Sequence, residues 1–241
     1  MRTAMILAST IALASCGMVA DARENGDAGP VTQRNFAVAD FDSVSLGGPH
    51  NVVVKVGPAA SVRAEGPSNE LDRLEIEVKN GDLKIRTKKD KWFGSAHKGK
   101  PVTVYVTTPR LAGAAIGGSG DMKIDRVEGG KFDAAIGGSG DMEIASLKVE
   151  QASFSIGGSG AIRAAGSAAT TDVSIAGSGD IDISGVESRT ASVSIAGSGD
   201  VKARASDTAS VSIVGSGDVE MAGGAKCKVS KMGAGDVRCG A

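Results

Sequence analysis

A short glycine-rich motif recurs seven times in the second half of the chain, and this repeat constrains the fold more than any other feature. Six copies read Ile-(Gly/Ala/Val)-Gly-Ser-Gly-(Asp/Ala), and a shortened seventh copy reads Met232-Gly-Ala-Gly-Asp236. The six full copies start at Ile116, Ile136, Ile156, Ile175, Ile195 and Ile213, so their spacing is nearly constant. A period of about 19 residues, repeated this often, predicts a repeat architecture in which each copy builds one coil.

The residues around each motif have the pattern of β-strands. In Val173-Ser-Ile175 and Ile181-Asp-Ile183, apolar and polar residues alternate on either side of the glycines, which is the period of a half-buried strand. The glycines and the β-branched residues disfavour a helix. We therefore predict an all-β chain that folds as a single-chain parallel β-helix, or β-solenoid, of about 19-residue coils. The chirality of parallel crossovers predicts a right-handed coil.

The second residue after each Asp position is charged, and we expect it to face outward. Its sign alternates without exception along the seven copies. These residues are Lys123, Glu143, Arg163, Asp182, Lys202, Glu220 and Arg238. In a parallel stack they are direct neighbours, where opposite charges stabilise the pairing by about 0.2–1 kcal/mol per pair. We interpret them as an electrostatic ladder that fixes the register, the alternative being a solvated charged face.

The motif also places an aspartate in almost every coil. The column consists of Asp121, Asp141, Asp180, Asp200, Asp218 and Asp236, with Ala161 in the place of its third member. Like charges one coil apart repel, so we expect these carboxylates to be exposed or to accept backbone N–H bonds at the bend. A groove for a cation or another ligand is the alternative. Calcium is disfavoured, because the calcium-binding repeat Gly-Gly-x-Gly-x-Asp places its aspartate one residue later.

The first half of the chain carries no complete motif. Residues 44–54 resemble a divergent early coil, with Gly-Gly-Pro-His in place of Gly-Ser-Gly-Asp, and residues 74–85 read as a hairpin around Asn80-Gly81. We expect this half to cover the N-terminal edge of the solenoid. Residues 36–241 then form one domain, with divergent coils and the hairpin over 36–110 and the motif-bearing coils over 111–241.

Residues 1–22 have the features of a secretory signal peptide, with a basic head and a short apolar run. Cys16 ends a segment that resembles a bacterial lipobox, in which the cysteine is lipidated. The alternative is cleavage after Ala20-Asp-Ala22, which yields a soluble protein. Residues 23–35 read as a tether. Either way we expect export, as an outer-membrane lipoprotein or as a periplasmic or secreted protein, and no later segment is apolar enough to span a membrane.

Export implies an oxidising compartment, in which Cys227 and Cys239 are predicted to form a disulfide across the last coil. Alternation predicts that both cysteines point inward, from opposite sides of that coil. The two histidines, His50 and His97, lie in no metal-ligand spacing. We therefore expect neither a metal nor a cofactor.

A basic segment interrupts the first half and contains the only tryptophan. Between residues 84 and 110 the net charge is +7. The residues that we single out are Arg86, Lys88, Lys89, Lys91, Trp92, Phe93, Lys98 and Lys100. One hypothesis is a contact site for an anionic glycan, lipopolysaccharide or a lipid surface. The alternative is a solvated loop with one tucked-in aromatic side chain.

Composition narrows the function. The formal net charge of -1 predicts no general affinity for nucleic acid. No nucleophile elbow and no singular pair of carboxylates occurs, which disfavours an enzyme. We predict a non-enzymatic envelope protein that offers a rigid surface for adhesion, ligand binding or scaffolding, with an envelope protein as another candidate partner. A purely structural envelope component and a polysaccharide-active β-helix enzyme are the alternatives.

Several of these features together resemble the bacterial GIN domain, a family named as the head of auto-transporter adhesins. They are the Ser-Gly-Asp repeats after Pro109-Arg-Leu111, the hairpin at Asn80-Gly-Asp-Leu83 and the exported N-terminus. The resemblance covers residues 36–240. It implies a β-helical fold and a surface or envelope location, and it supplies no catalytic residues.

Overall fold

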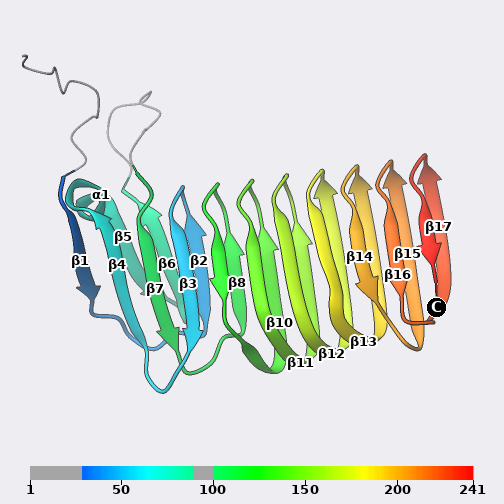
Figure 1. Ribbon diagram of the computed structural model, residues 1–241, viewed down its shortest axis with the longest axis horizontal. Coiled ribbons are helices and arrows are strands. Elements are labelled where there is room, and N and C mark those ends of the chain that lie inside the picture. Colours follow the sequence, from blue (N-terminus) through cyan, green and yellow to red (C-terminus); the bar gives the residue numbers. More distant parts are fainter. Residues whose placement is uncertain (1–28, 89–99, 241) are drawn as a thin grey trace, which may run out of the picture.

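The computed structural model describes residues 29–88 and 100–240. Most of this part of the chain is β-strand, and the strands stack as coils along one long axis (Figure 1). Each coil has two long sides, which the glycine motif joins at one end and a bend or turn joins at the other. The predicted all-β solenoid is thereby confirmed. We call the side that follows the motif the charged face and the side that precedes it the serine face.

Short strands build the coils toward both ends of the stack. On the charged face they are β7 (Thr103–Thr108), β3 (Asn51–Val56), β9 (Met122–Ile124), β14 (Val201–Arg204), β16 (Val219–Ala222) and β18 (Val237–Cys239). On the serine face they are β6 (Asp82–Thr87), β2 (Ser43–Gly47), β8 (Gly113–Ile116), β15 (Thr208–Gly215) and β17 (Lys226–Gly233). In the middle of the stack, long strands bend around the lower end of the coil in Figure 1. These are β10 (Val127–Ile136), β11 (Met142–Ile156), β12 (Ala161–Gly177) and β13 (Asp180–Gly197).

Neighbouring coils pair in parallel, and the motif keeps them in register. The isoleucines that open the motif pair directly from coil to coil and are buried. Apolar side chains from both faces meet inside the coil, where Phe132 and Phe154 are fully buried. These two aromatic residues therefore belong to the core. The thin interior explains why small and β-branched residues dominate the apolar composition.

Glycine is required where consecutive coils approach most closely. A Cβ atom built on Gly138 would lie 2.1 Å from the carbonyl oxygen of Gly118, and one on Gly140 would lie 2.0 Å from that of Gly120. No side chain fits at these distances, because ordinary contact begins near 3.4 Å. The glycines of the motif are thus a steric condition of parallel stacking.

A cap of mostly antiparallel strands begins the molecule, at the blue end of Figure 1. β1 (Val31–Phe36) pairs with β4 (Ser61–Pro67), and β4 pairs with β7. A short helix, α1 (Ser68–Arg73), leads to β5 (Leu74–Lys79), which forms a hairpin with β6. Because β6 and β7 stack in parallel on β2 and β3, the cap covers the N-terminal edge of the solenoid.

The predicted hairpin is confirmed, and its turn has the expected conformation. Asn80 and Gly81 have φ angles of 55° and 78°. Two successive residues in the left-handed region are typical of the turn that suits the right-handed twist of a two-residue hairpin.

Two expectations about the first half need correction. The tether expected over residues 23–35 is wrong for Val31–Asn35, which belong to β1 and pair with β4. In the early coil, Asn51 and not His50 takes the place of the motif aspartate, since Val52 pairs with Met122.

Within the described residues, no helix has the length and apolar character needed to cross a membrane.

Candidate binding surfaces

The aspartate column binds each coil to the next through its side chains. The Oδ1 atom of Asp121 accepts the backbone N–H of Asp141 at 3.0 Å, and that of Asp141 accepts the N–H of Ala161 at 3.0 Å. The same bond recurs in the later coils, at 2.7 to 3.1 Å. There the carboxylates of Asp180, Asp200 and Asp218 each accept the backbone N–H of the next aspartate in the column, the last of which is Asp236. One oxygen of each of these carboxylates therefore holds the neighbouring coil, in the way expected for acceptors at a bend.

The break in the column shows that the bond is replaceable. Ala161 offers no carboxylate, and the N–H of Asp180 instead donates to the carbonyl oxygen of Gly160 at 3.1 Å. At the start of the column, the amide oxygen of Asn51 stands 3.5 Å from the backbone nitrogen of Asp121. The shared property of the column is an acceptor oxygen. Within the described part of the chain, no three His, Cys, Asp or Glu side chains gather as a metal ion would require.

The alternating charges form one continuous row across the charged face. Direct register pairs run from Lys123 to Arg238 through every member of the series. Among these described residues, only Lys123 and Glu143 form an ion pair within 4 Å, with Nζ to Oε2 at 3.3 Å. The side chains are mostly exposed, so each neighbouring pair contributes little on its own. The stabilising effect of the row on coil register therefore comes from the regular placement of opposite charges along the whole face, and not from any single ion pair.

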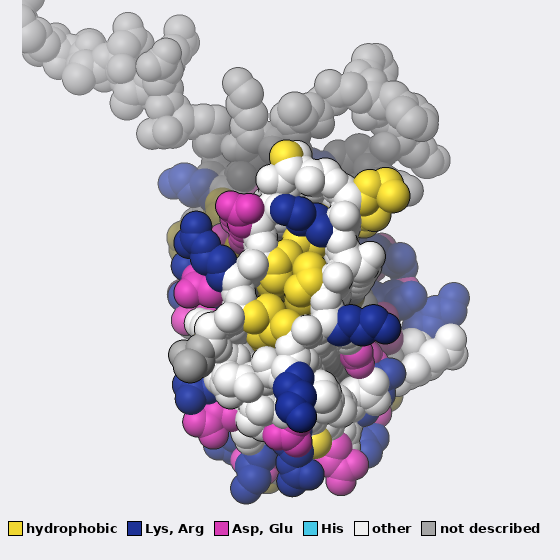
Figure 2. Space-filling view, turned by 90° about the vertical axis from the view of Figure 1, so that its right-hand side faces the viewer, with side chains coloured by type: hydrophobic (Ala, Val, Ile, Leu, Met, Phe, Trp, Pro, Cys, Tyr) yellow, Lys and Arg dark blue, Asp and Glu magenta, His cyan; other side chains and the backbone are white. Residues whose placement is uncertain are grey.

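The last described coil carries the disulfide. Cys227 on β17 and Cys239 on β18 are bonded, which confirms that prediction. Cys227 is only partly buried and Cys239 is exposed, because no further coil covers them in the described structure. Apolar side chains fill the middle of this end of the stack, ringed by backbone (Figure 2). Lys231 takes the place of the motif isoleucine, and its ammonium donates to the carbonyl oxygen of Gly235 at 2.5 Å.

The basic segment is only partly within the described residues. Lys89, Lys91, Trp92, Phe93 and Lys98 lie outside them, and so does Cys16 near the N-terminus. Arg86 lies on strand β6, and its guanidinium pairs with Glu75 at 3.1 Å and with Glu77. The ammonium of Lys88 donates to the carbonyl oxygen of Asp72 at 2.8 Å. Arg86 and Lys88 therefore hold the cap together, whereas Lys100 is exposed.

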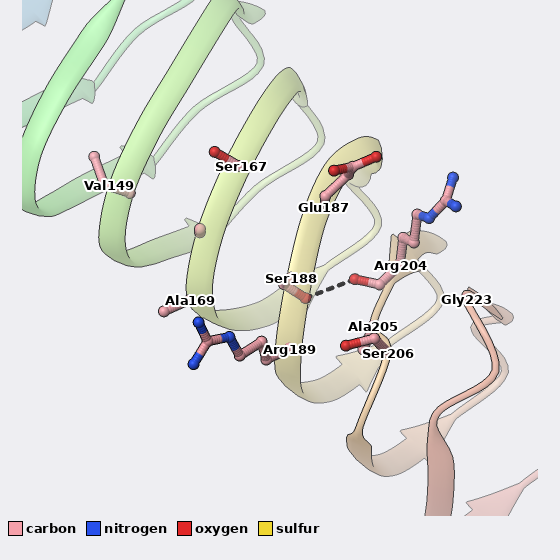
Figure 3. A pocket seen from close by; sticks show the side chains of 11 residues that line it. Val149, Ser167, Ala169, Glu187, Ser188, Arg189, Arg204, Ala205, Ser206 and Gly223 are labelled. Carbon is pink, nitrogen blue, oxygen red and sulfur yellow. Dashed lines mark hydrogen bonds between the residues drawn. The ribbon is translucent and has the colours of Figure 1, made fainter.

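A hollow of about 530 Å³ lies where the coils become shorter toward the C-terminal end of the stack (Figure 3). The shorter coil turns directly after Arg204, where strand β14 ends. The hydroxyl of Ser188 donates to the Arg204 carbonyl oxygen at 2.6 Å. Arg189 and Arg204 both line the hollow, but their side chains point away from each other in Figure 3. Glu187 is another residue of the lining. The two guanidinium groups therefore do not converge on one small anion in this hollow.

A second hollow, of about 570 Å³, lies on the charged face of the cap. It contains Tyr105, the only tyrosine of the chain, with the Arg63 guanidinium 4.4 Å from the centre of its ring. We did not predict this hollow from the sequence. The pattern Thr103-Val-Tyr105-Val-Thr107 could have pointed to it, because alternation places the tyrosine outward among polar residues.

One family model matches most of the chain. A family described as "Putative auto-transporter adhesin, head GIN domain" matches residues 40–225. By contrast, none of the curated proteins matches this chain.

Solved structures share the fold at low sequence identity. A "putative adhesin" from Bacteroides fragilis has a TM-score of 0.77 and 21% identity, over 86% of this chain and 96% of that chain. A "Putative lipid binding protein" from Parabacteroides distasonis has a TM-score of 0.67 and 23% identity, over 87% and 96%. A "putative adhesin" from the same species has a TM-score of 0.67 and 24% identity, over 87% and 96%. Likeness at this level of identity shows the fold alone.

Proposed function

Because this chain belongs to the GIN-domain family described above, we propose that it is a non-enzymatic protein of the cell envelope. In this role it is exported and uses the outside of a rigid β-solenoid to attach to a surface or ligand. The signal-peptide pattern of residues 1–22 supports export, and Cys16 supplies an anchor if the lipobox is used instead of cleavage after Ala22. Two solved structures with this fold carry the names "putative adhesin" and "Putative lipid binding protein", which are in keeping with attachment.

The repetition of chemical groups along the stack carries the proposal. Both polar columns of the charged face repeat from coil to coil, and the aspartates already bind the neighbouring coil through one oxygen. Catalysis needs a singular constellation of groups around one reacting atom. Repeated groups on a stiff support suit attachment at many points, where weak contacts sum to avidity.

Anionic envelope material is the ligand class that we propose: an anionic glycan, lipopolysaccharide or a lipid surface. The net charge of +7 between residues 84 and 110 favours such ligands, since attraction to an anionic surface adds up over several lysines. The cap already uses Arg86 and Lys88. The remaining lysines of this segment are therefore the part that we expect to contact the ligand.

A direct test uses the full mature chain and its single tryptophan, Trp92. The probes are phosphatidylglycerol vesicles, lipopolysaccharide and polygalacturonate, with phosphatidylcholine vesicles as the uncharged comparison. We expect a saturable change in Trp92 fluorescence with at least one anionic probe. The change should weaken as salt is raised toward about 1 M, because screening then shortens the reach of surface charges to about 3 Å.

A matched pair of variants separates the basic segment from charge in general. Lys91→Gln with Lys98→Gln should weaken binding, whereas the same changes at Lys148 and Lys228, which are exposed on distant coils outside the alternating row, should not. A flat response to every probe would contradict the proposal and favour a purely structural envelope component.

A further inference from the structure

The hollow around Tyr105 breaks the regular chemistry of the charged face. The transverse row that carries the alternating charges continues past Lys123 into the cap, where it reads Val53, Tyr105, Arg63 and Asn35 by direct strand pairing. Alternation of charge stops at Lys123. An aromatic ring and a guanidinium follow, on strands that come from separate parts of the chain. This combination occurs at one place and does not repeat along the described stack.

Arg63 is held in a defined position by the tyrosine. Its guanidinium carbon lies 4.4 Å from the ring centre, as in a cation–π contact. A guanidinium stacked in this way keeps its N–H edges directed sideways, where they match the two oxygens of a carboxylate. Its carboxylate partner Glu65 is at 3.8 Å and both side chains are partly exposed, so that pair is weak. Arg63 is therefore ready to bind an external anion.

The other groups of the hollow add a second cation and apolar surface. Lys55 lies beside Thr107 at the same level of the sheet, and Phe36 and Val38 form part of the wall while packing on the core. Among the described residues that line the hollow, none carries a carboxylate. Val53, the neighbour of Tyr105 on β3, has a short side chain that leaves space beside the ring on the side away from Arg63.

We propose that this hollow binds an acidic sugar unit of an anionic glycan. The carboxylate of the sugar accepts hydrogen bonds from Arg63 and Lys55, and the apolar face of the sugar ring packs against Tyr105 above Val53. The inference rests on the proposed attachment function, whose ligand it names. An inserted lipid is a poorer fit. The exposed large apolar side chains of the described chain are Val31, Val214, Val229 and Met232, and none of them lines the hollow.

The single tyrosine and the single tryptophan make the test site-specific. The full mature chain is prepared with ¹³C-labelled tyrosine, so that one ring signal reports on the hollow while Trp92 fluorescence reports on the basic segment. The probe is tri-galacturonate, and its methyl ester, which lacks the charge, is the control ligand. We expect the Tyr105 signal to shift saturably with tri-galacturonate and to stay in place with the ester.

Two variants test the anion contacts independently. Arg63→Gln and Lys55→Gln should each weaken binding by about tenfold or more, the loss expected for one charge-assisted hydrogen bond. Lys55 is exposed, so its variant keeps the test valid if Arg63→Gln disturbs the cap. Lys148→Gln removes an exposed cation from β11, outside both the hollow and the alternating row, and should leave the affinity unchanged.

Each other outcome overturns the inference in a recognisable way. If tri-galacturonate changes Trp92 but not Tyr105, the hollow is not the site, although the attachment function stands. If inorganic phosphate or phosphatidylglycerol vesicles shift Tyr105 equally, the site recognises anions and not an acidic sugar. If no anionic probe moves either reporter, the inference and the proposed function both fail.

Discussion

Substituting one glycine of the motif tests whether close stacking, and not backbone freedom, dictates the repeat. In Gly199→Ala, the new Cβ would lie 2.1 Å from the carbonyl oxygen of Gly179 in the preceding coil. Gly199 is not among the glycines with positive φ, so the added methyl group meets a steric conflict alone. Ordinary contact begins at 3.4 Å, so the two backbones must separate by the difference between these distances.

That movement acts against bonds that hold the two coils at the same bend. The N–H of Ser198 donates to the Gly177 carbonyl oxygen at 2.9 Å, and the N–H of Asp200 donates to the Asp180 carboxylate at 3.1 Å. Weakening two such bonds costs about 1 kcal/mol each, on top of about 1–3 kcal/mol for overpacking. We therefore expect Gly199→Ala to lower the free energy of unfolding by about 3–5 kcal/mol, which is a large fraction of the ordinary total.

The chain supplies two matched controls for this substitution. A Cβ on Gly130 or on Gly129 would meet nothing within 4 Å, and only Gly129 has a positive φ, of 148°. Gly130→Ala should be neutral or stabilising by up to about 1 kcal/mol, and Gly129→Ala should cost about 1–3 kcal/mol through backbone strain alone. Urea unfolding followed by circular dichroism measures all three. Equal stability of Gly199→Ala and Gly130→Ala would refute the steric argument.

Two further predictions concern the bonds between coils. Replacing Cys227 and Cys239 by serine should lower the stability of the last coil by about 3 kcal/mol, visible as faster amide exchange in β17; unchanged exchange would contradict a role for the disulfide in holding that edge. Asp200→Ala should cost up to about 1 kcal/mol and speed the exchange of the Asp218 amide, which loses its carboxylate acceptor and is left with a backbone carbonyl oxygen, as Asp180 is after Ala161, whereas Asp200→Asn keeps a side-chain acceptor oxygen and should preserve protection. Equal exchange in both variants would show that the side-chain bond does not hold the coil.

The repeat made most of the solenoid predictable, because a fixed spacing determines which residues become neighbours. The pairing of Lys202 with Glu220, for example, follows from the position of each in its motif. The strand β1 could not be found in the same way. Its residues are mostly exposed on both sides, so they have no apolar alternation, and backbone pairing with β4 holds them in place.

The hollow around Tyr105 was beyond sequence reasoning for a related physical reason. Arg63 and Tyr105 lie far apart in a part of the chain without a period, and antiparallel pairing of β4 with β7 brings them together. Arg86 illustrates the converse. Its place in a basic run suggested a free cation, but the hairpin puts two glutamates of β5 beside it. Local composition alone does not reveal a partner on another strand.

The aspartate column and the alternating charged row respond differently to the insertion or deletion of whole coils. Each aspartate holds the next coil regardless of which coil that is, so the hydrogen-bonded column tolerates gain or loss of coils one at a time. The alternating row has a parity: loss of the coil around Glu143 would set Lys123 against Arg163, whereas loss of two adjacent coils would keep opposite signs in contact. Duplication in pairs is therefore the step that leaves both columns intact.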